Sequence, residues 1–195
     1  PKQYLNIGIS EQALISIAAG LAKCGKKVYV YAINNFVSLR VLEQVNVDVC
    51  MMNLDVNIIG VGAGFTYSTD GPTHHGVQDL SAMINLPNLQ IYNVTDDLNT
   101  RKIVDLSYDD TSPKYIRIEK GVLPRLYSEE DNISTGMKKI CDTESDVVVF
   151  STGYMTHFTN NVVNKLMSEG LNISHYDLFR LKPLPISKIL SLVNK

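Results

Sequence analysis

The sequence EQALISIAAGLAKCGKKVYVYAI, residues 11–33, places a helical pattern directly before a strand pattern. Its apolar residues at positions 14, 15, 17, 18 and 21 lie on one face of a helix. Ser10 is a suitable N-cap for this helix, and Gly25 is a natural end. The following KKVYVYAI is rich in β-branched and aromatic residues, as in a buried strand. This stretch predicts a helix that packs against a sheet.

The same alternation continues along the chain. The predicted elements are a helix from residue 37 in VSLRVLEQVNVDVCMMN, a strand in VNIIGVG, a short helix in LSAMINL, a strand in LQIYNV, a helix in DDLNTRKIVDLSY and a strand in PKYIRI. Strands that alternate with helices, several of them apolar throughout, are typical of a mostly parallel sheet with helices on both faces. We therefore expect an α/β fold.

The hydrophobic pattern of helices and strands stops after Gly121, where a polar segment begins. We expect a first domain over 1–122, a linker over 123–144, and a second, incomplete α/β domain over 145–195. The second domain is predicted from the strand VVVFSTG, the helix THFTNNVVNKLMSEG and the strand NISHYDLF. Because the chain starts directly before a helix and stops inside another helical pattern, we expect a fragment or a split subunit.

Composition narrows the class of protein. With 45% hydrophobic residues, the 195-residue chain can bury a normal core. A net charge of −2 gives no basic field, which argues against nucleic acid as a partner. No signal peptide and no apolar run of membrane-spanning length are found. The three widely spaced cysteines, Cys24, Cys50 and Cys141, indicate buried thiols of a cytoplasmic protein, neither disulfides nor zinc ligands.

Three polar segments follow predicted strands: Asn34–Phe36, the glycine-rich residues 62–76, and Lys120–Gly121. Open α/β sheets bind ligands beyond the carboxyl ends of their strands, so these segments should converge on one edge. Within the second segment, DGPTHHG carries Asp70, His74 and His75. A metal site is a poor fit, since adjacent histidines rarely ligate one ion. The turn is either a polar loop or a set of acid–base groups for a hydroxylated ligand.

Two further residues have a structural and a functional interpretation. Glu11 either complements the dipole at the start of its helix or holds a ligand nitrogen and shares a proton with it. Phe36 is either a core residue or a flat ring on which a heteroaromatic cofactor stacks.

Taken together, these segments resemble the transketolase family, which uses thiamine diphosphate. NIGISEQALISIAAG is similar to the family's glycine-isoleucine-x-glutamate motif and its alanine-glycine helix, and INNFVSLRVLEQV to the aromatic segment that packs on the pyrimidine. STDGPTHHGVQDL is similar to the family's DGPTH loop. The segment from DVVVFSTG to HYDLFRLKPLP resembles the start of the C-terminal domain. The resemblance covers nearly all of the chain.

The resemblance implies roles for individual residues. Glu11 would contact N1′ of the aminopyrimidine and act in catalysis, and Phe36 would stack on the ring. Asp70 and His74 would hydrogen-bond the hydroxyls beside a ketose carbonyl, with His74 also catalytic. Leu39 would line the pyrimidine pocket, at a position where the family usually has an aromatic residue.

Other positions depart from the family pattern. A histidine of many relatives corresponds to Gly62. Lys120 would bind substrate where the family has an arginine, and as a point charge it lacks the bidentate fork. His75 receives no role.

The resemblance also implies a partner. The domain that binds the diphosphate and its Mg²⁺ or Ca²⁺ has no counterpart in the sequence, so a diphosphate-binding subunit or domain would hold the metal. We expect a component of a transketolase that transfers a two-carbon ketol unit from a ketose to an aldose, in a homodimer or heterotetramer. The alternatives are a deoxyxylulose-phosphate-synthase-like component and a non-catalytic binding module that kept the fold.

Overall fold

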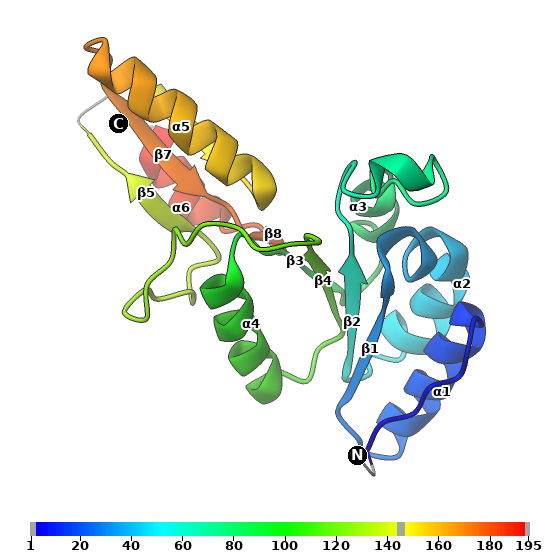
Figure 1. Ribbon diagram of the computed structural model, residues 1–195. Helices are drawn as coiled ribbons and strands as arrows, with labels where there is room; N and C mark the ends of the chain where they lie inside the picture. Colours follow the sequence, from blue (N-terminus) through cyan, green and yellow to red (C-terminus); the bar gives the residue numbers. More distant parts are fainter. Residues whose placement is uncertain (1–2, 144–146, 194–195) are drawn as a thin grey trace. The chain divides into compact units, whose positions relative to one another are not determined.

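The computed structural model describes residues 3–143 and 147–193, which form two compact units (Figure 1). Unit 1 comprises the residues up to Leu89 together with Asp110–Arg117, and unit 2 comprises Gln90–Asp109 and the residues from Ile118 onward. Within the described ranges, no helix is long and apolar enough to cross a membrane. The three cysteines are free thiols, but the prediction that they are buried is correct for Cys50 and wrong for Cys24, which is exposed.

Unit 1 holds three strands in the order β1, β2, β4, with helical segments between them. Its elements are α1 (Glu11–Lys23), β1 (Val28–Ile33), η1 (Asn34–Phe36), η2 (Leu39–Val41), α2 (Leu42–Gln44), η3 (Val45–Cys50), β2 (Val56–Val61), η4 (Ser68–Asp70), α3 (Asp79–Met83) and most of β4 (Lys114–Ile118). Strands β1 and β2 are parallel. The predicted α/β fold is confirmed.

Helix α1 forms where the apolar periodicity predicts it, and it buries Ile15, Ala18 and Ala19. Ser10 precedes it as expected, but the prediction of a capping side chain is wrong. The Ser10 hydroxyl donates to the carbonyl of Ile7 at 2.8 Å and makes no cap hydrogen bond.

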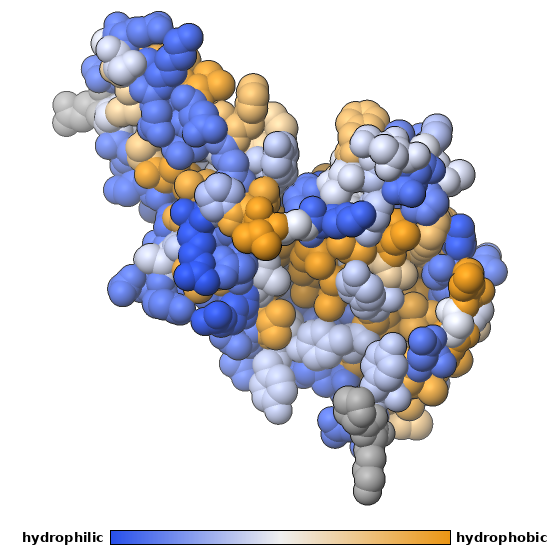
Figure 2. All heavy atoms as spheres, viewed as in Figure 1, coloured by the Kyte–Doolittle hydropathy of each residue, from blue (hydrophilic) through white to orange (hydrophobic). Residues whose placement is uncertain are grey.

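The predicted helix from residue 37 is a composite of η2, α2 and the π-helical η3, and it begins at Leu39. Its valines at positions 41, 45 and 49 recur every four residues and are fully buried. Strand β1 differs from its prediction as a buried strand. It lies at the edge of its sheet, and Tyr29 and Tyr31 are 41% and 63% exposed. Exposed apolar side chains are visible as orange spheres in Figure 2.

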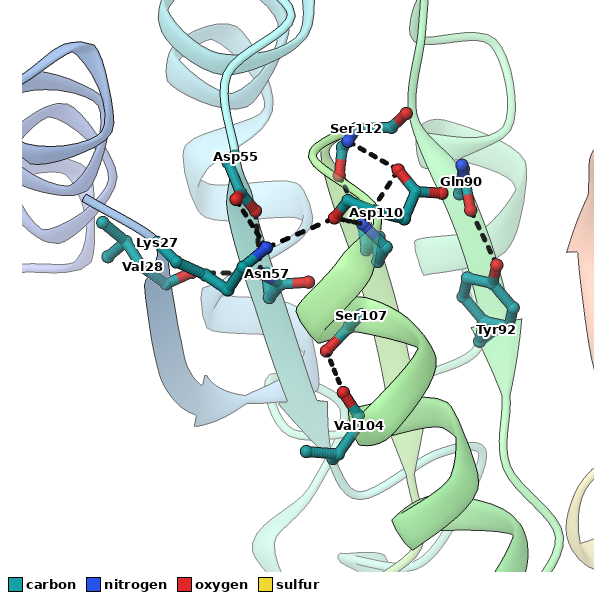
Figure 3. Close-up of polar contacts among 11 residues, drawn as sticks. Lys27, Val28, Asp55, Asn57, Gln90, Tyr92, Val104, Ser107, Asp110 and Ser112 are labelled. Atoms are coloured by element: carbon teal, nitrogen blue, oxygen red, sulfur yellow. Dashed lines mark hydrogen bonds and ion pairs between the residues drawn. The ribbon is translucent and has the colours of Figure 1, made fainter. Parts of the chain in front are cut away.

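A polar cluster joins the amino ends of the unit 1 strands (Figure 3). The Lys27 ammonium, directly before β1, donates to Asp55 Oδ2 at 2.5 Å and to the Asp110 carbonyl at 3.3 Å. Lys114 is fully buried and donates to the carbonyls of Asp110 and Ser112, each at 2.7 Å. Because desolvation disfavours a buried ammonium, the pKa of Lys114 is lowered. These contacts fix the strand ends away from the polar loops.

Unit 2 contains a three-stranded sheet in the order β5-β7-β6, in which β6 and β7 are parallel and β5 and β7 antiparallel. Strands β3 and β8 pair with each other in antiparallel fashion. The elements are β3 (Gln90–Asn93), α4 (Asp97–Asp109), β5 (Lys138–Cys141), β6 (Val147–Ser151), α5 (Tyr154–Ser168), β7 (Ile173–Asp177), β8 (Arg180–Lys182) and α6 (Ile186–Val193).

Strand β5 lies inside the segment predicted as a linker over 123–144, because its residues pair with β7 despite their polar neighbours. The predicted start of the second domain at 145 lies outside the described residues. Compactness alone does not define a domain, so the boundary near 122 stays a prediction.

Asp177 at the end of β7 anchors unit 2 internally. It is fully buried and accepts hydrogen bonds from the hydroxyls of Thr95 at 2.5 Å, Tyr127 at 2.7 Å and Thr156 at 2.8 Å. Burial raises the pKa of Asp177 to about 6, against the lowering effect of these donors. The network ties β7 to α5 and to the segments before α4 and β5.

Candidate functional site

The carboxyl ends of β1 and β2 lie at one edge of unit 1, since Ile33 pairs with Val61 in the parallel register. The turn 34–36 and the loop 62–76 both start at this edge, as predicted from the sequence. Such an edge is where open α/β sheets carry their ligands.

Glu11 and Phe36 meet through a third residue that the sequence did not single out. Glu11 opens α1 with its side chain only 12% exposed, and Arg40 Nη1 donates to its Oε2 at 2.9 Å. The same guanidinium lies over the Phe36 ring, with Cζ 3.9 Å from the centroid. Arg40 follows Phe36 by four residues, a spacing that could have pointed to this contact. A carboxylate and an aromatic face thus flank one flat cation.

His74 joins the same cluster. Its ring centroid lies 5.1 Å from that of Phe36, edge-on at 66°, and 6.1 Å from that of Tyr67. The Thr73 hydroxyl lies 3.0 Å from His74 Nδ1, and Asn35 Nδ2 donates to the Thr73 carbonyl at 3.1 Å. With Nδ1 engaged by Thr73, Nε2 is the ring nitrogen available to a ligand hydroxyl.

Asp70 lies in the same loop, exposed, at the end of η4. Burial, followed by the nearby Tyr31 and Asp70, raises the pKa of Tyr67, so Asp70 lies within electrostatic reach of the phenol beside His74. Leu39 is half-buried at the start of η2. Lys120 belongs to unit 2, where it is exposed, and its placement beside the other residues stays a prediction.

A buried ion pair lies beneath this cluster. Asp79 Oδ2 accepts hydrogen bonds from Arg117 Nε at 2.8 Å, from the Tyr115 hydroxyl at 2.8 Å and from Asn34 Nδ2 at 3.0 Å. Arg117 Nη2 also donates to the Gly76 carbonyl at 2.6 Å. The pair therefore links the turn after β1, the end of the polar loop and strand β4. Neither Asp79 nor Arg117 has a role predicted from the sequence, because the two residues that pair are 38 positions apart.

The turn η1 also contains two buried acceptors. The Oδ1 atoms of Asn34 and Asn35 accept no hydrogen bond within the part of the chain that the structure describes. Buried polar atoms are normally paired, so these oxygens can each accept a hydrogen bond from an ordered water. The edge thus offers a carboxylate, an aromatic face and an imidazole nitrogen, which suits a flat nitrogen heterocycle or a polyol.

A cavity lies in unit 2. This cavity of about 540 Å³ is lined by residues around the start of α4 and the segment after β4, including Val94, Ile118 and Leu123. None of the predicted site residues lines it. Its walls are largely apolar, and all of its lining residues belong to unit 2.

The sequence matches the profile of the family described as "Transketolase, pyrimidine binding domain" over residues 1–125. It is 31% identical over 190 residues to one subunit of the apulose-4-phosphate transketolase of Phocaeicola vulgatus, covering 97% of this chain and 61% of the relative. It is 32% identical over 195 residues to the 1-deoxy-D-xylulose-5-phosphate synthase of Dictyoglomus turgidum, covering 99% of this chain and 31% of that protein. The chain thus spans about three fifths or less of the length of these relatives.

Solved structures give a similar result. A structure described as "Split gene transketolase, inactive beta4 tetramer" superposes with a TM-score of 0.88 at 28% identity, covering 98% of this chain and 62% of the other. Transketolase from Campylobacter jejuni superposes with a TM-score of 0.85 at 16% identity, covering 94% of this chain and 29% of that one, which shows the fold alone.

Proposed function

Since this chain belongs to the family of transketolase pyrimidine-binding domains, we propose that it is a subunit of a split, thiamine-diphosphate-dependent transketolase. The reaction transfers a two-carbon ketol unit from a ketose to an aldose. The relative from Phocaeicola vulgatus is a transketolase subunit of similar sequence, which supports this choice. Free cysteines fit the further proposal of a cytoplasmic enzyme of carbohydrate metabolism.

One observation carries the proposal: Glu11 and Phe36 converge on a single flat group, the Arg40 guanidinium. A carboxylate at the edge and a ring at the face are the contacts that an aminopyrimidine requires, so these residues fit the cofactor. Leu39, half-buried three residues after Phe36, adds apolar lining.

When bound, thiamine diphosphate would supply a nucleophilic carbon and an electron sink for cleavage of the carbon–carbon bond beside the ketose carbonyl. Glu11 would hold the proton at N1′ of the aminopyrimidine, and Phe36 would stack on the face of the ring. His74 exchanges a hydrogen bond through Nε2 with the hydroxyl beside the carbonyl. Asp70 accepts from a second hydroxyl, and Lys120 attracts an anionic group of the substrate.

The remainder of the site comes from a partner. Among the described residues, no group of three or more His, Cys, Asp or Glu side chains is arranged to hold a metal ion. As the family resemblance implies, a diphosphate-binding subunit or domain would hold the diphosphate and its Mg²⁺ or Ca²⁺, in a homodimer or heterotetramer. Similarity to 1-deoxy-D-xylulose-5-phosphate synthase supports a second candidate, an enzyme component that uses pyruvate as donor.

The test is reconstitution with a diphosphate-binding partner, thiamine diphosphate and Mg²⁺, assayed with a ketose or with pyruvate as donor. Glu11→Gln should remove most turnover and leave folding intact, whereas Glu43→Gln, at an exposed helical position, should change little. Wild-type turnover in Glu11→Gln would reject the proton role. With an aldose acceptor present, turnover with pyruvate and none with a ketose would replace the transketolase assignment with the synthase.

The sugar loop has its own test. His74→Ala should raise the KM of the donor more than it weakens cofactor binding, while His75→Ala serves as the matched control. His75 contacts Phe65 at 5.1 Å between centroids and carries no proposed role. An unchanged KM in His74→Ala would reject the assignment of this loop to the donor.

A further inference from the structure

Arg40 makes both contacts that the proposed function assigns to the aminopyrimidine. Its guanidinium donates to the Glu11 carboxylate at 2.9 Å and lies 3.9 Å from the Phe36 centroid. A flat ring about as thick as a guanidinium must enter the same space to touch the carboxylate with its edge and the phenyl ring with its face. Two groups cannot occupy that space at once.

The Arg40 side chain can move out of the space between Glu11 and Phe36. Its side chain is 44% exposed, and its guanidinium contacts Glu11 and Phe36. It lies on the short 3₁₀ turn η2, whereas Glu11 is held at 12% exposure at the start of α1. A half-exposed cation keeps much of its hydration, so its ion pair and its cation–π contact are both weak. The long side chain can turn outward without a backbone change.

The Glu11 carboxylate has a hydrogen-bond donor both before and after this exchange. Glu11 is nearly covered, and a covered carboxylate without a donor is costly. Arg40 supplies that donor in the present arrangement. A protonated ring nitrogen supplies it after the exchange, so the two states differ mainly in which donor Glu11 holds.

We propose that Arg40 occupies the place of the aminopyrimidine and is displaced when the cofactor binds, so that Arg40 sets the affinity of this chain for thiamine diphosphate. This inference rests on the proposed function. It assigns to Arg40 a competing role that is separate from the proton chemistry at Glu11.

The experiment measures thiamine diphosphate affinity by calorimetry in the complex with the diphosphate-binding partner and Mg²⁺. Arg40→Ala should bind the cofactor about three- to tenfold more tightly, because two weak contacts no longer compete. Arg40→Lys keeps the ion pair with Glu11 but loses the flat stack on Phe36. Its affinity for thiamine diphosphate should therefore lie between that of the wild type and that of Arg40→Ala. Addition of thiamine diphosphate should also shift the Arg40 Nε–H signal in NMR spectra of the wild type.

Two control variants separate this inference from the proposed function. Phe36→Ala and Glu11→Gln should each weaken binding if the proposed function is correct, and unchanged affinity in both would reject that function together with the inference. If both weaken binding while Arg40→Ala also weakens it or leaves it unchanged, Arg40 supports the site and the competition is refuted. Circular dichroism of each variant checks that the fold is intact.

Discussion

The buried pair Asp79–Arg117 gives the sharpest test of what holds the candidate site together. The Asp79 side chain is 1% exposed and that of Arg117 is 11% exposed. Arg117→Gln leaves the carboxylate with the neutral donors Tyr115 and Asn34, and it removes the 2.6 Å hydrogen bond to the Gly76 carbonyl. Breaking a buried pair from one side costs about 3–5 kcal/mol. We expect unit 1 to lose stability by this amount.

The assay is urea unfolding, with the salt bridge Asp97–Arg125 as the matched control. That pair is also an aspartate with an arginine, held through several short hydrogen bonds, but its side chains are 51% and 58% exposed. Because exposed charges stay hydrated and screened, Arg125→Gln should change the midpoint little. Equal effects of the two substitutions would refute the assignment of stability to burial.

A double-mutant cycle completes this test. Asp79→Asn alone also breaks the pair, but Asp79→Asn combined with Arg117→Gln leaves no uncompensated charge. The double variant should therefore lose clearly less stability than the sum of the two single variants. Additive losses would mean that the two charges do not stabilise each other.

Two other predictions concern pH and backbone geometry. Since burial raises the pKa of Asp177 to about 6, above about 3.9 in the unfolded chain, this group favours folding fully below pH 4 and less as pH rises through 6. The free energy of unfolding of the wild type minus that of Asp177→Asn should thus fall by about 2 kcal/mol from pH 4 to 7, and a flat difference would contradict the raised pKa. A Cβ at Gly62 would lie 2.1 Å from the Tyr67 ring at a φ of +89°, so Gly62→Ala should destabilise unit 1 more than Gly64→Ala, where φ is +58° and no atom lies within 4 Å. In a Tyr67→Ala background the cost of Gly62→Ala should drop to about 1–2 kcal/mol of backbone strain, and an unchanged cost would exclude the ring as its cause.

Sequence periodicity predicted the α/β fold because each helix and strand carries its own pattern, as in α1 and β2. It also predicted that the segments around Phe36 and His74 share an edge, since parallel strands place their carboxyl ends together. It missed Arg40, whose partner Glu11 is 29 residues away, and Arg117, whose partner is 38 residues away. Long-range ion pairs leave no local pattern, so they follow only from the folded geometry. The roles of the site residues remain proposals.

The two arginines of unit 1 explain how one edge can be both rigid and open to a ligand. Arg117 is nearly buried and bonded on both sides, so displacing it would strand the Asp79 carboxylate in the interior. Arg40 is half-exposed, and under the proposed function a ring nitrogen replaces it as the donor to Glu11, so its departure strands no charge. Burial therefore decides which cation is part of the frame and which is exchangeable. If hydrogen exchange in the reconstituted enzyme showed that cofactor binding loosens strand β4 around Arg117, Arg117 would not be part of a rigid frame and this division of roles would be wrong.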